Sequence, residues 1–213
     1  MKKLRLITLL SLVCFIFLPV NTAFAQKGTQ VVVPDTVKDP HSRYTAKYES
    51  GTHQHCTAIL ISSTVALTAK HCGGNNRKSF NGTIYPGESG LSTPFGYMNI
   101  STYIPNPDYD IAILKGTKQD QSRAYQYYIK NFSTKVSGFT DAEFDGFVNR
   151  EAYSYGYPYK FSGYKQYRSD GQVTFHQKNG ELTGILITRT QNYEGNILPF
   201  TKGIAEWVNK NAS

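Results

Sequence analysis

The chain has 213 residues, of which 39% are hydrophobic and 18% are charged, and it contains 12 Phe, 16 Tyr and one Trp. This length allows one large domain or two small lobes and excludes a large multidomain protein, while the aromatic content excludes a wholly disordered chain. The formal net charge of +8 is spread out, without a block of five or six basic residues, so we expect no nucleic-acid partner.

The first 25 residues have the three parts of a signal peptide. Basic residues at positions 2, 3 and 5 precede an apolar run over 6–20, and Ala23-Phe24-Ala25 has the small-x-small pattern that signal peptidase cleaves. We therefore expect cleavage before Gln26, a secreted protein and no membrane association after cleavage. A membrane anchor is the alternative, but the apolar run is shorter than the roughly 20 residues that span a bilayer.

Two cysteines remain after cleavage, Cys56 and Cys72, because the third lies in the signal peptide. Secreted thiols normally oxidise, so we expect the two to form a disulfide. The alternative is a metal site in which both cysteines act with His53, His55 and His71. Since that spacing fits no standard zinc pattern, the sequence favours the disulfide.

Short β-rich runs recur along the rest of the chain between clusters of Gly, Pro, Asn and Asp. Many short strands with polar turns are typical of sandwiches and barrels. The predicted strands are Gln30–Val33, Tyr44–Tyr48, Cys56–Ile61, Thr64–Thr68, Ser79–Tyr85, Tyr97–Ile104, Ile111–Lys115, Ala152–Tyr155, Gln172–Phe175 and Leu182–Thr188.

Two helices are predicted among these strands. One is a short helix over Ser122–Tyr128. The other ends the chain at Thr201–Asn211, where the first threonine can cap the backbone and Ile204, Trp207 and Val208 share one face. The polar segment around the short helix is interpreted as the join between two strand-rich lobes.

The most specific pattern is Val65-Ala66-Leu67-Thr68-Ala69-Lys70-His71-Cys72. It resembles the histidine motif of the trypsin-like serine proteases, usually Leu-Thr-Ala-Ala-His-Cys, in which the cysteine bonds back to one before a neighbouring strand. Cys56 stands where that partner belongs. Further along, Asp110 begins Asp-Ile-Ala-Ile-Leu, which is similar to the Asp-Ile-Ala-Leu-Leu motif of the family, at the spacing from His71 that is typical of bacterial members.

This resemblance implies a role for each of the two residues. A hydroxyl is a poor nucleophile at neutral pH, so an imidazole must take its proton, and the imidazolium then needs a carboxylate to hold its tautomer and balance its charge. His71 would act as general base and later as general acid, and Asp110 would orient it. The alternative is a core histidine beside a disulfide and an aspartate that opens a strand.

Other segments are similar to one branch of the family. Val31-Val32-Val33-Pro34-Asp35 resembles the mature N-terminus of secreted glutamyl endopeptidases, 154–158 resembles their Gly-Tyr-Pro turn, and Phe200–Val208 resembles their terminal helix. The resemblance to the glutamyl endopeptidase and exfoliative toxin branch implies an all-β fold of two chymotrypsin-like antiparallel β-barrels with a C-terminal helix. The domain would span 26–213, with lobe 1 over about 26–118 and lobe 2 over about 119–213.

The nucleophile loop of the family is missing. Neither Gly-Asn-Ser-Gly-Ser-Pro nor Gly-Asp-Ser-Gly-Gly-Pro occurs in the sequence, and the strand predicted to end at Phe175 runs almost directly into a turn at 176–181. We therefore expect the second barrel to lack about one strand. The candidate nucleophile is Ser169, in Arg-Ser-Asp-Gly, a scrambled version of the motif. Leu186 stands where glutamate-specific relatives place a histidine, which argues against specificity for glutamate.

Three hypotheses follow from these features. The first is a secreted, monomeric serine endopeptidase that needs no cofactor and cleaves proteins or peptides through an acyl-enzyme, with His71, Asp110 and Ser169 as catalytic residues. The second is a homologue without catalysis that binds a protein or peptide in the active-site cleft expected between the two lobes. The third is a poorly folding remnant of a deletion. The missing serine motif favours the last two, and the retained His71 and Asp110 contexts favour continued use of the cleft.

Overall fold

The structure, a computed structural model, describes residues 29–51, 55–146, 150–161, 163–172, 184–189 and 195–213. The predicted signal peptide and its cleavage point lie outside the described residues, as do His53 and the predicted turn at 176–181. Within the described ranges, no helix has the length and apolar character needed to cross a membrane.

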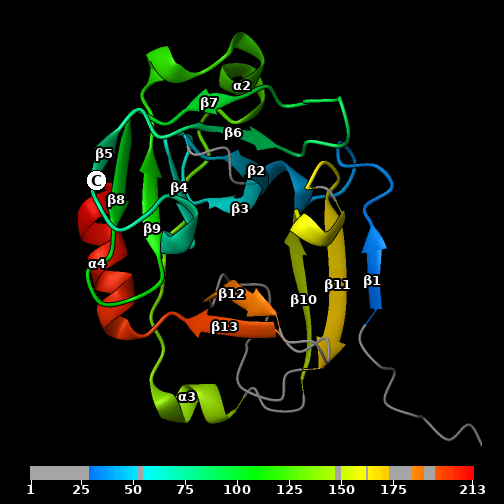
Figure 1. The fold of residues 1–213 in the computed structure, drawn as a ribbon. Helices are drawn as coiled ribbons and strands as arrows, with labels where there is room; N and C mark the ends of the chain where they lie inside the picture. Colours follow the sequence, from blue (N-terminus) through cyan, green and yellow to red (C-terminus); the bar gives the residue numbers. More distant parts are fainter. Residues whose placement is uncertain (1–28, 52–54, 147–149, 162, 173–183, 190–194) are drawn as a thin grey trace, which may run out of the picture.

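An eight-stranded antiparallel sheet forms the first lobe (Figure 1). In spatial order its strands are β5 (Lys78–Ser79), β8 (Thr102–Pro105), β9 (Ala112–Lys115), β4 (Val65–Thr68), β3 (His55–Leu60), β2 (Thr45–Glu49), β6 (Thr83–Pro86) and β7 (Met98–Asn99). The neighbouring strands β9 and β4, in the interior of this sheet, position the candidate site.

Both faces of the central strands are buried, which explains their continuous apolar runs. In β9, Ala112 and Leu114 contribute to one hydrophobic cluster inside the lobe. Ile113 and the preceding Ile111 point the other way, into a second cluster with residues of the C-terminal helix such as Val208. Because side chains alternate along a strand, a single short segment serves both cores and cannot shift its register without burying the wrong residues.

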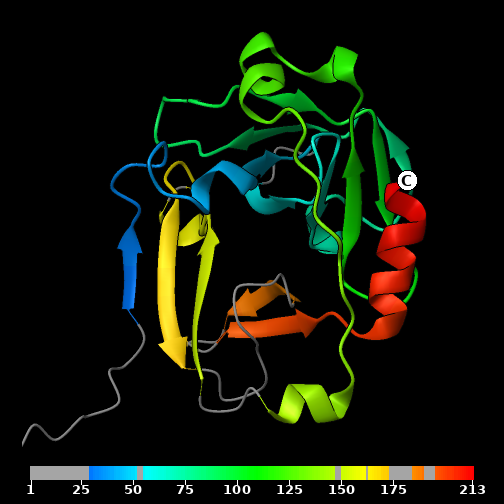
Figure 2. The same cartoon turned by 180° about the vertical axis from the view of Figure 1, so that it is seen from behind.

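The second lobe has two smaller antiparallel sheets. Strand β11 (Tyr167–Gln172) lies between β1 (Thr29–Val32) and β10 (Glu151–Gly156), and β12 (Gly184–Arg189) pairs with β13 (Gly195–Pro199). Seen from behind, the sheet of β1, β11 and β10 lies on the opposite side of the molecule from the C-terminal helix, and β12 and β13 lie between them (Figure 2). This arrangement of antiparallel sheets confirms the all-β class.

Helix α4 (Lys202–Ala212) confirms the predicted C-terminal helix, and the hydroxyl of Thr201 accepts a hydrogen bond from the backbone N–H of Ile204 as expected of a cap. Helix α2 (Arg123–Tyr128) confirms the second prediction. Helix α3 (Asp141–Asp145) was not predicted. The remaining helical turns are the short 3-10 helices η1 (Ser42–Tyr44), η2 (Lys70–Cys72), η3 (Lys118–Asp120) and η4 (Tyr159–Phe161).

Strand boundaries differ from the predictions in both lobes. In the first lobe, the strands predicted over Ser79–Tyr85 and Tyr97–Ile104 are each divided in two, into β5 and β6 and into β7 and β8. The predicted strand over Gln172–Phe175 is wrong at its start, because β11 begins at Tyr167 and ends at Gln172, and residues 173–175 lie outside the described part of the chain. Asp and Gly, which stand in the middle of β11, are depleted in strands. This strand therefore depends on its pairing with β1 and β10. Strand β13 was not predicted.

A buried polar network joins the two lobes. From the first lobe, Lys47 in β2 forms an ion pair of 2.8 Å with Glu88, and the two side chains are only 6% and 5% exposed. From the second lobe, the hydroxyl of Tyr157 donates to the Glu88 carbonyl at 3.0 Å, and Gln166 donates to the Thr45 carbonyl at 3.0 Å. The ends of β10 and β11 are therefore fastened to the first lobe by hydrogen bonds as well as by packing.

Candidate active site

The pairing of β4 with β9 brings His71 and Asp110 together. The last residue of β4, Thr68, is opposite Ala112, the first residue of β9, in an antiparallel register. The chain that leaves β4 therefore lies beside the chain that enters β9. His71 follows β4 in η2, and Asp110 lies two residues before β9. The continuous apolar strands thus bring together two polar residues that are distant in sequence.

Two hydrogen bonds connect these residues. The Nδ1 atom of His71 lies 2.7 Å from Oδ2 of Asp110, and the backbone N–H of His71 donates to Oδ1 at 2.9 Å. Both carboxylate oxygens are thereby used, which fixes the orientation of Asp110 as well as that of the ring. The His71 side chain is 54% exposed and that of Asp110 is 29% exposed, so the second ring nitrogen, Nε2, remains available for another partner.

The loop between β8 and β9 is shaped by Asn106, which sequence reasoning did not select. Its side-chain oxygen accepts hydrogen bonds from the backbone N–H groups of Asp108 at 2.9 Å and Tyr109 at 3.0 Å. Such a turn is a common use of asparagine. The sequence Asn-Pro-Asp directly before the aspartate motif was the signal that could have identified it.

The Tyr103 side chain holds the turn η2 that carries His71. It is fully buried in β8, and its hydroxyl donates to the Lys70 carbonyl at 2.8 Å and also lies 2.7 Å from the carbonyl oxygen of Gly74. Burial raises the pKa of Tyr103 well above its usual value, and the negative charge of Asp110 raises it further. The hydroxyl therefore stays protonated and continues to hold η2 at any physiological pH.

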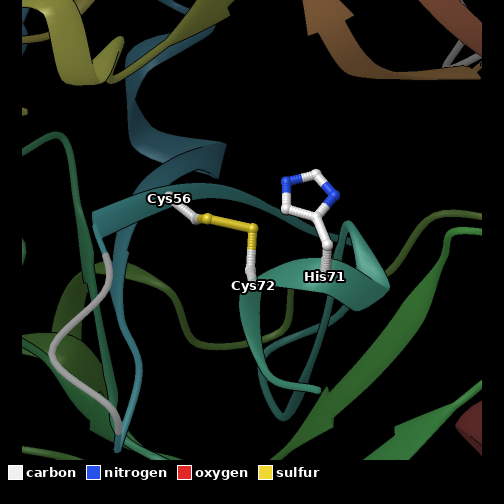
Figure 3. A group of neighbouring side chains, drawn as sticks. All are labelled: Cys56, His71 and Cys72. Carbon is white, nitrogen blue, oxygen red and sulfur yellow. A yellow bond between two sulfur atoms is a disulfide. The ribbon is translucent and has the colours of Figure 1, made fainter. Parts of the chain in front are cut away.

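The predicted disulfide between Cys56 and Cys72 is confirmed. Figure 3 shows the His71 ring projecting from η2 beside this bond. A donor atom from each cysteine and one from His71 lie within 4.8 Å of one another, whereas His55, which the structure also describes, is not part of this group. Zinc binds thiolates, and here the two sulfur atoms are bonded to each other.

Removing this disulfide is expected to lower the free energy of unfolding by about 3 kcal/mol, because an open chain gains conformational entropy when it unfolds. Urea denaturation of wild-type protein and of the Cys56→Ala/Cys72→Ala variant would measure the difference. The variant should also be insensitive to a thiol reductant that destabilises the wild type. Equal stability of both proteins would show that the cross-link contributes nothing.

Ser169, the third predicted catalytic residue, lies in β11 and does not join the His71–Asp110 pair. It occupies the middle of β11, opposite Gln30 of β1 and Ser154 of β10, and its hydroxyl accepts a hydrogen bond of 3.0 Å from the side-chain amide of Gln30. Figure 1 shows β11 on the far side of β10 from β9. Among the described residues, no hydrogen bond connects Ser169 to His71, so the structure joins two of the three predicted catalytic residues and not the third.

The similarity of this chain to known proteins shows which family it belongs to. The sequence matches the trypsin family over residues 32–185, which is most of the chain. The chain belongs to the trypsin family. A solved structure of a Glu endopeptidase in complex with MPD is similar, with a TM-score of 0.65 and 18% identity, over 88% of this chain and 98% of that one.

Neuropsin, a serine protease expressed in the limbic system of mouse brain, is similar over 82% of this chain and 97% of its own, with a TM-score of 0.55 and 14% identity. At these identities the similarity concerns the fold, and it confirms the chymotrypsin-like architecture predicted from the motifs. No curated protein sequence matches the chain significantly. Membership of this protease family supports a proteolytic function and implies protein or peptide substrates.

Proposed function

We propose that this trypsin-family protein is a secreted serine endopeptidase, with a signal peptide over 1–25 and a protease domain over 26–213. The observation that carries the proposal is the 2.7 Å contact between Nδ1 of His71 and the Asp110 carboxylate. That contact is the orienting half of a serine-protease triad. Secretion is supported by the small-x-small sequence before Gln26 and by the disulfide.

In this proposal His71 handles the proton at its free nitrogen. With Nδ1 held by Asp110, Nε2 is the atom that takes a proton from a hydroxyl as the hydroxyl attacks a peptide carbonyl, and it then returns the proton to the leaving amine. The resulting acyl-enzyme is hydrolysed when His71 removes a proton from water in the same way. Asp110 stabilises the imidazolium in both steps and is not itself protonated.

Ser169 is the proposed nucleophile, and its present contacts set a condition on that role. An activated hydroxyl has to lie within about 3.2 Å of the base. Ser169 is instead bound by Gln30 in the middle of a paired strand. To act, the Ser169 hydroxyl must exchange its hydrogen bond with the Gln30 amide for one with the His71 ring.

A second candidate function is binding of a protein or peptide without cleavage, and the position of Ser169 favours it. A family member that retains the His71–Asp110 pair but has no hydroxyl beside Nε2 would still present a partly exposed imidazole to a bound protein or peptide. Loss of the nucleophile alone costs about a millionfold in turnover in a serine protease, so such a protein would have no ordinary proteolytic activity.

Labelling with a fluorophosphonate probe separates the two functions. The endopeptidase predicts an adduct on the secreted protein, mapped to Ser169 by peptide analysis, that is lost in both His71→Ala and Ser169→Ala. The binding function predicts no adduct, but saturable binding of a peptide library that His71→Ala weakens. A protein that neither reacts nor binds would refute both, and a mature N-terminus other than Gln26 in the culture medium would refute the predicted cleavage point.

A further inference from the structure

Lys70 connects the two segments that carry His71 and Asp110. Its ammonium group donates a hydrogen bond of 2.9 Å to the carbonyl of Asn106 and lies 3.4 Å from the carbonyl oxygen of Pro107. Lys70 opens η2 directly before His71, whereas Asn106 and Pro107 begin the loop that leads to Asp110. One side chain therefore spans the gap between the two halves of the pair.

The other polar groups of Asn106 form hydrogen bonds within the loop, which leaves the carbonyls of residues 106 and 107 for Lys70. Asn106 is 4% exposed, its backbone N–H donates to Ile111 at 2.8 Å, and its side chain caps the N–H groups of Asp108 and Tyr109. Within the described part of the chain, no other donor reaches the carbonyls of residues 106 and 107. The loop thus has its own shape, and Lys70 is what fixes it against η2.

The backbone of Lys70 is held by β8, the strand that precedes the Asp110 loop. Its carbonyl accepts the hydrogen bond from Tyr103, which precedes the loop in β8. Two groups of one residue, its carbonyl and its ammonium, are thereby bound to opposite ends of the segment 103–107. His71 and Asp110 themselves are partly exposed, so packing alone does not determine the distance between them.

We propose that Lys70 is a positioning residue, which holds the Asp110 loop where both carboxylate oxygens reach His71. The inference rests on the proposed role of the His71–Asp110 pair. A hydrogen bond from a charged donor is stronger than one between neutral groups, and a side chain without a donor would leave the two carbonyls to water. The loop would then move relative to η2, and the contacts of Asp110 with the ring and with the His71 backbone would lengthen together.

Nuclear magnetic resonance on the full secreted protein tests this proposal without any need for cleavage. The observables are the low-field resonance of the His71 Nδ1–H and the hydrogen-exchange rate of the His71 backbone amide, which donates to Asp110. In Lys70→Met, the resonance should broaden beyond detection and the amide should exchange at least about tenfold faster. In Lys70→Arg both should resemble the wild type, because a guanidinium has several donors that can reach both carbonyls.

Lys78 offers a matched control. Its ammonium donates to the Gly73 carbonyl at 2.7 Å, just beyond the other end of η2, and among the described residues no hydrogen bond joins it to the Asp110 loop. Lys78→Met removes the same charge and the same kind of bond, and should leave both observables unchanged. The proposal is overturned if Lys70→Met behaves as the wild type, or if Lys78→Met perturbs His71 equally. Failure of probe labelling would instead contradict the endopeptidase and leave this result intact.

Discussion

Replacing Asp110 by asparagine is expected to lower the rate of peptide cleavage about ten-thousandfold, because an amide keeps the side chain in place but holds the imidazole in the wrong tautomer. Replacing His71 by alanine removes the base itself, and the expected loss is about a millionfold. Steady-state cleavage of a peptide library by the purified wild type and each variant measures both. The double variant should be no slower than His71→Ala, since residues that act as a unit are not additive.

Asp108 provides the control for these variants. It lies in the same loop, two residues before Asp110, and is exposed. Asp108→Asn makes the same chemical change, and the cleavage rate should not change. Equal losses in the Asp108 and Asp110 variants would mean that the charge of the loop matters and the specific contact with His71 does not. A wild-type protein as slow as His71→Ala would contradict the endopeptidase and favour binding without cleavage.

Replacing Lys47 by methionine is expected to lower the free energy of unfolding by about 3 to 5 kcal/mol near pH 8, because it leaves the buried Glu88 carboxylate without its partner. The two side chains are almost fully buried, so water cannot replace the lost ammonium. The double variant Lys47→Met/Glu88→Leu removes both charges and should recover most of the stability. Urea denaturation of the wild type, the single variant and the double variant measures these differences.

The loss of unfolding free energy in Lys47→Met should become smaller as the pH falls. Burial raises the pKa of Glu88 above the ordinary glutamate value of 4.5, and Lys47 opposes that shift. Without Lys47 the folded-state pKa rises further, so the folded protein binds a proton more readily than the unfolded chain does. Protonation then favours folding, and the destabilisation should shrink as the pH falls toward about 4.5. A loss that grows on acidification would contradict this account of the pair.

Much of the site could be predicted because each of its motifs lies within one short segment of the sequence. The strand and histidine motif of β4 and η2, the Asp110 motif before β9 and the pair of cysteines each occur in one short segment, and the β4–β9 register follows from their apolar runs. Helix α4 was predictable for a similar reason, since a capping threonine and one apolar face lie within a single segment.

The features that sequence reasoning missed depend on contacts between distant segments. Lysine is almost never fully buried, so nothing in the sequence marks Lys47 as part of a buried pair whose partner lies after β6. The hydrogen bond from Gln30 that holds Ser169 follows from the pairing of β1 with β11, strands that are separated by most of the chain. Strand β13 contains Gly, Asn and Pro, residues that usually mark turns.

Strand β1 lies at the edge of its sheet, and this position matters when the protein is produced in shortened or tagged form. Thr29–Val32 pair with β11 along one side only and thereby cover its outer edge. A recombinant version shortened to start at Val33 would expose that row of N–H and C=O groups, and uncovered rows of this kind recruit the matching row of another molecule. The short strand β1 thus takes the edge position in place of the longer β11, and an affinity tag is better attached behind α4 than in front of β1.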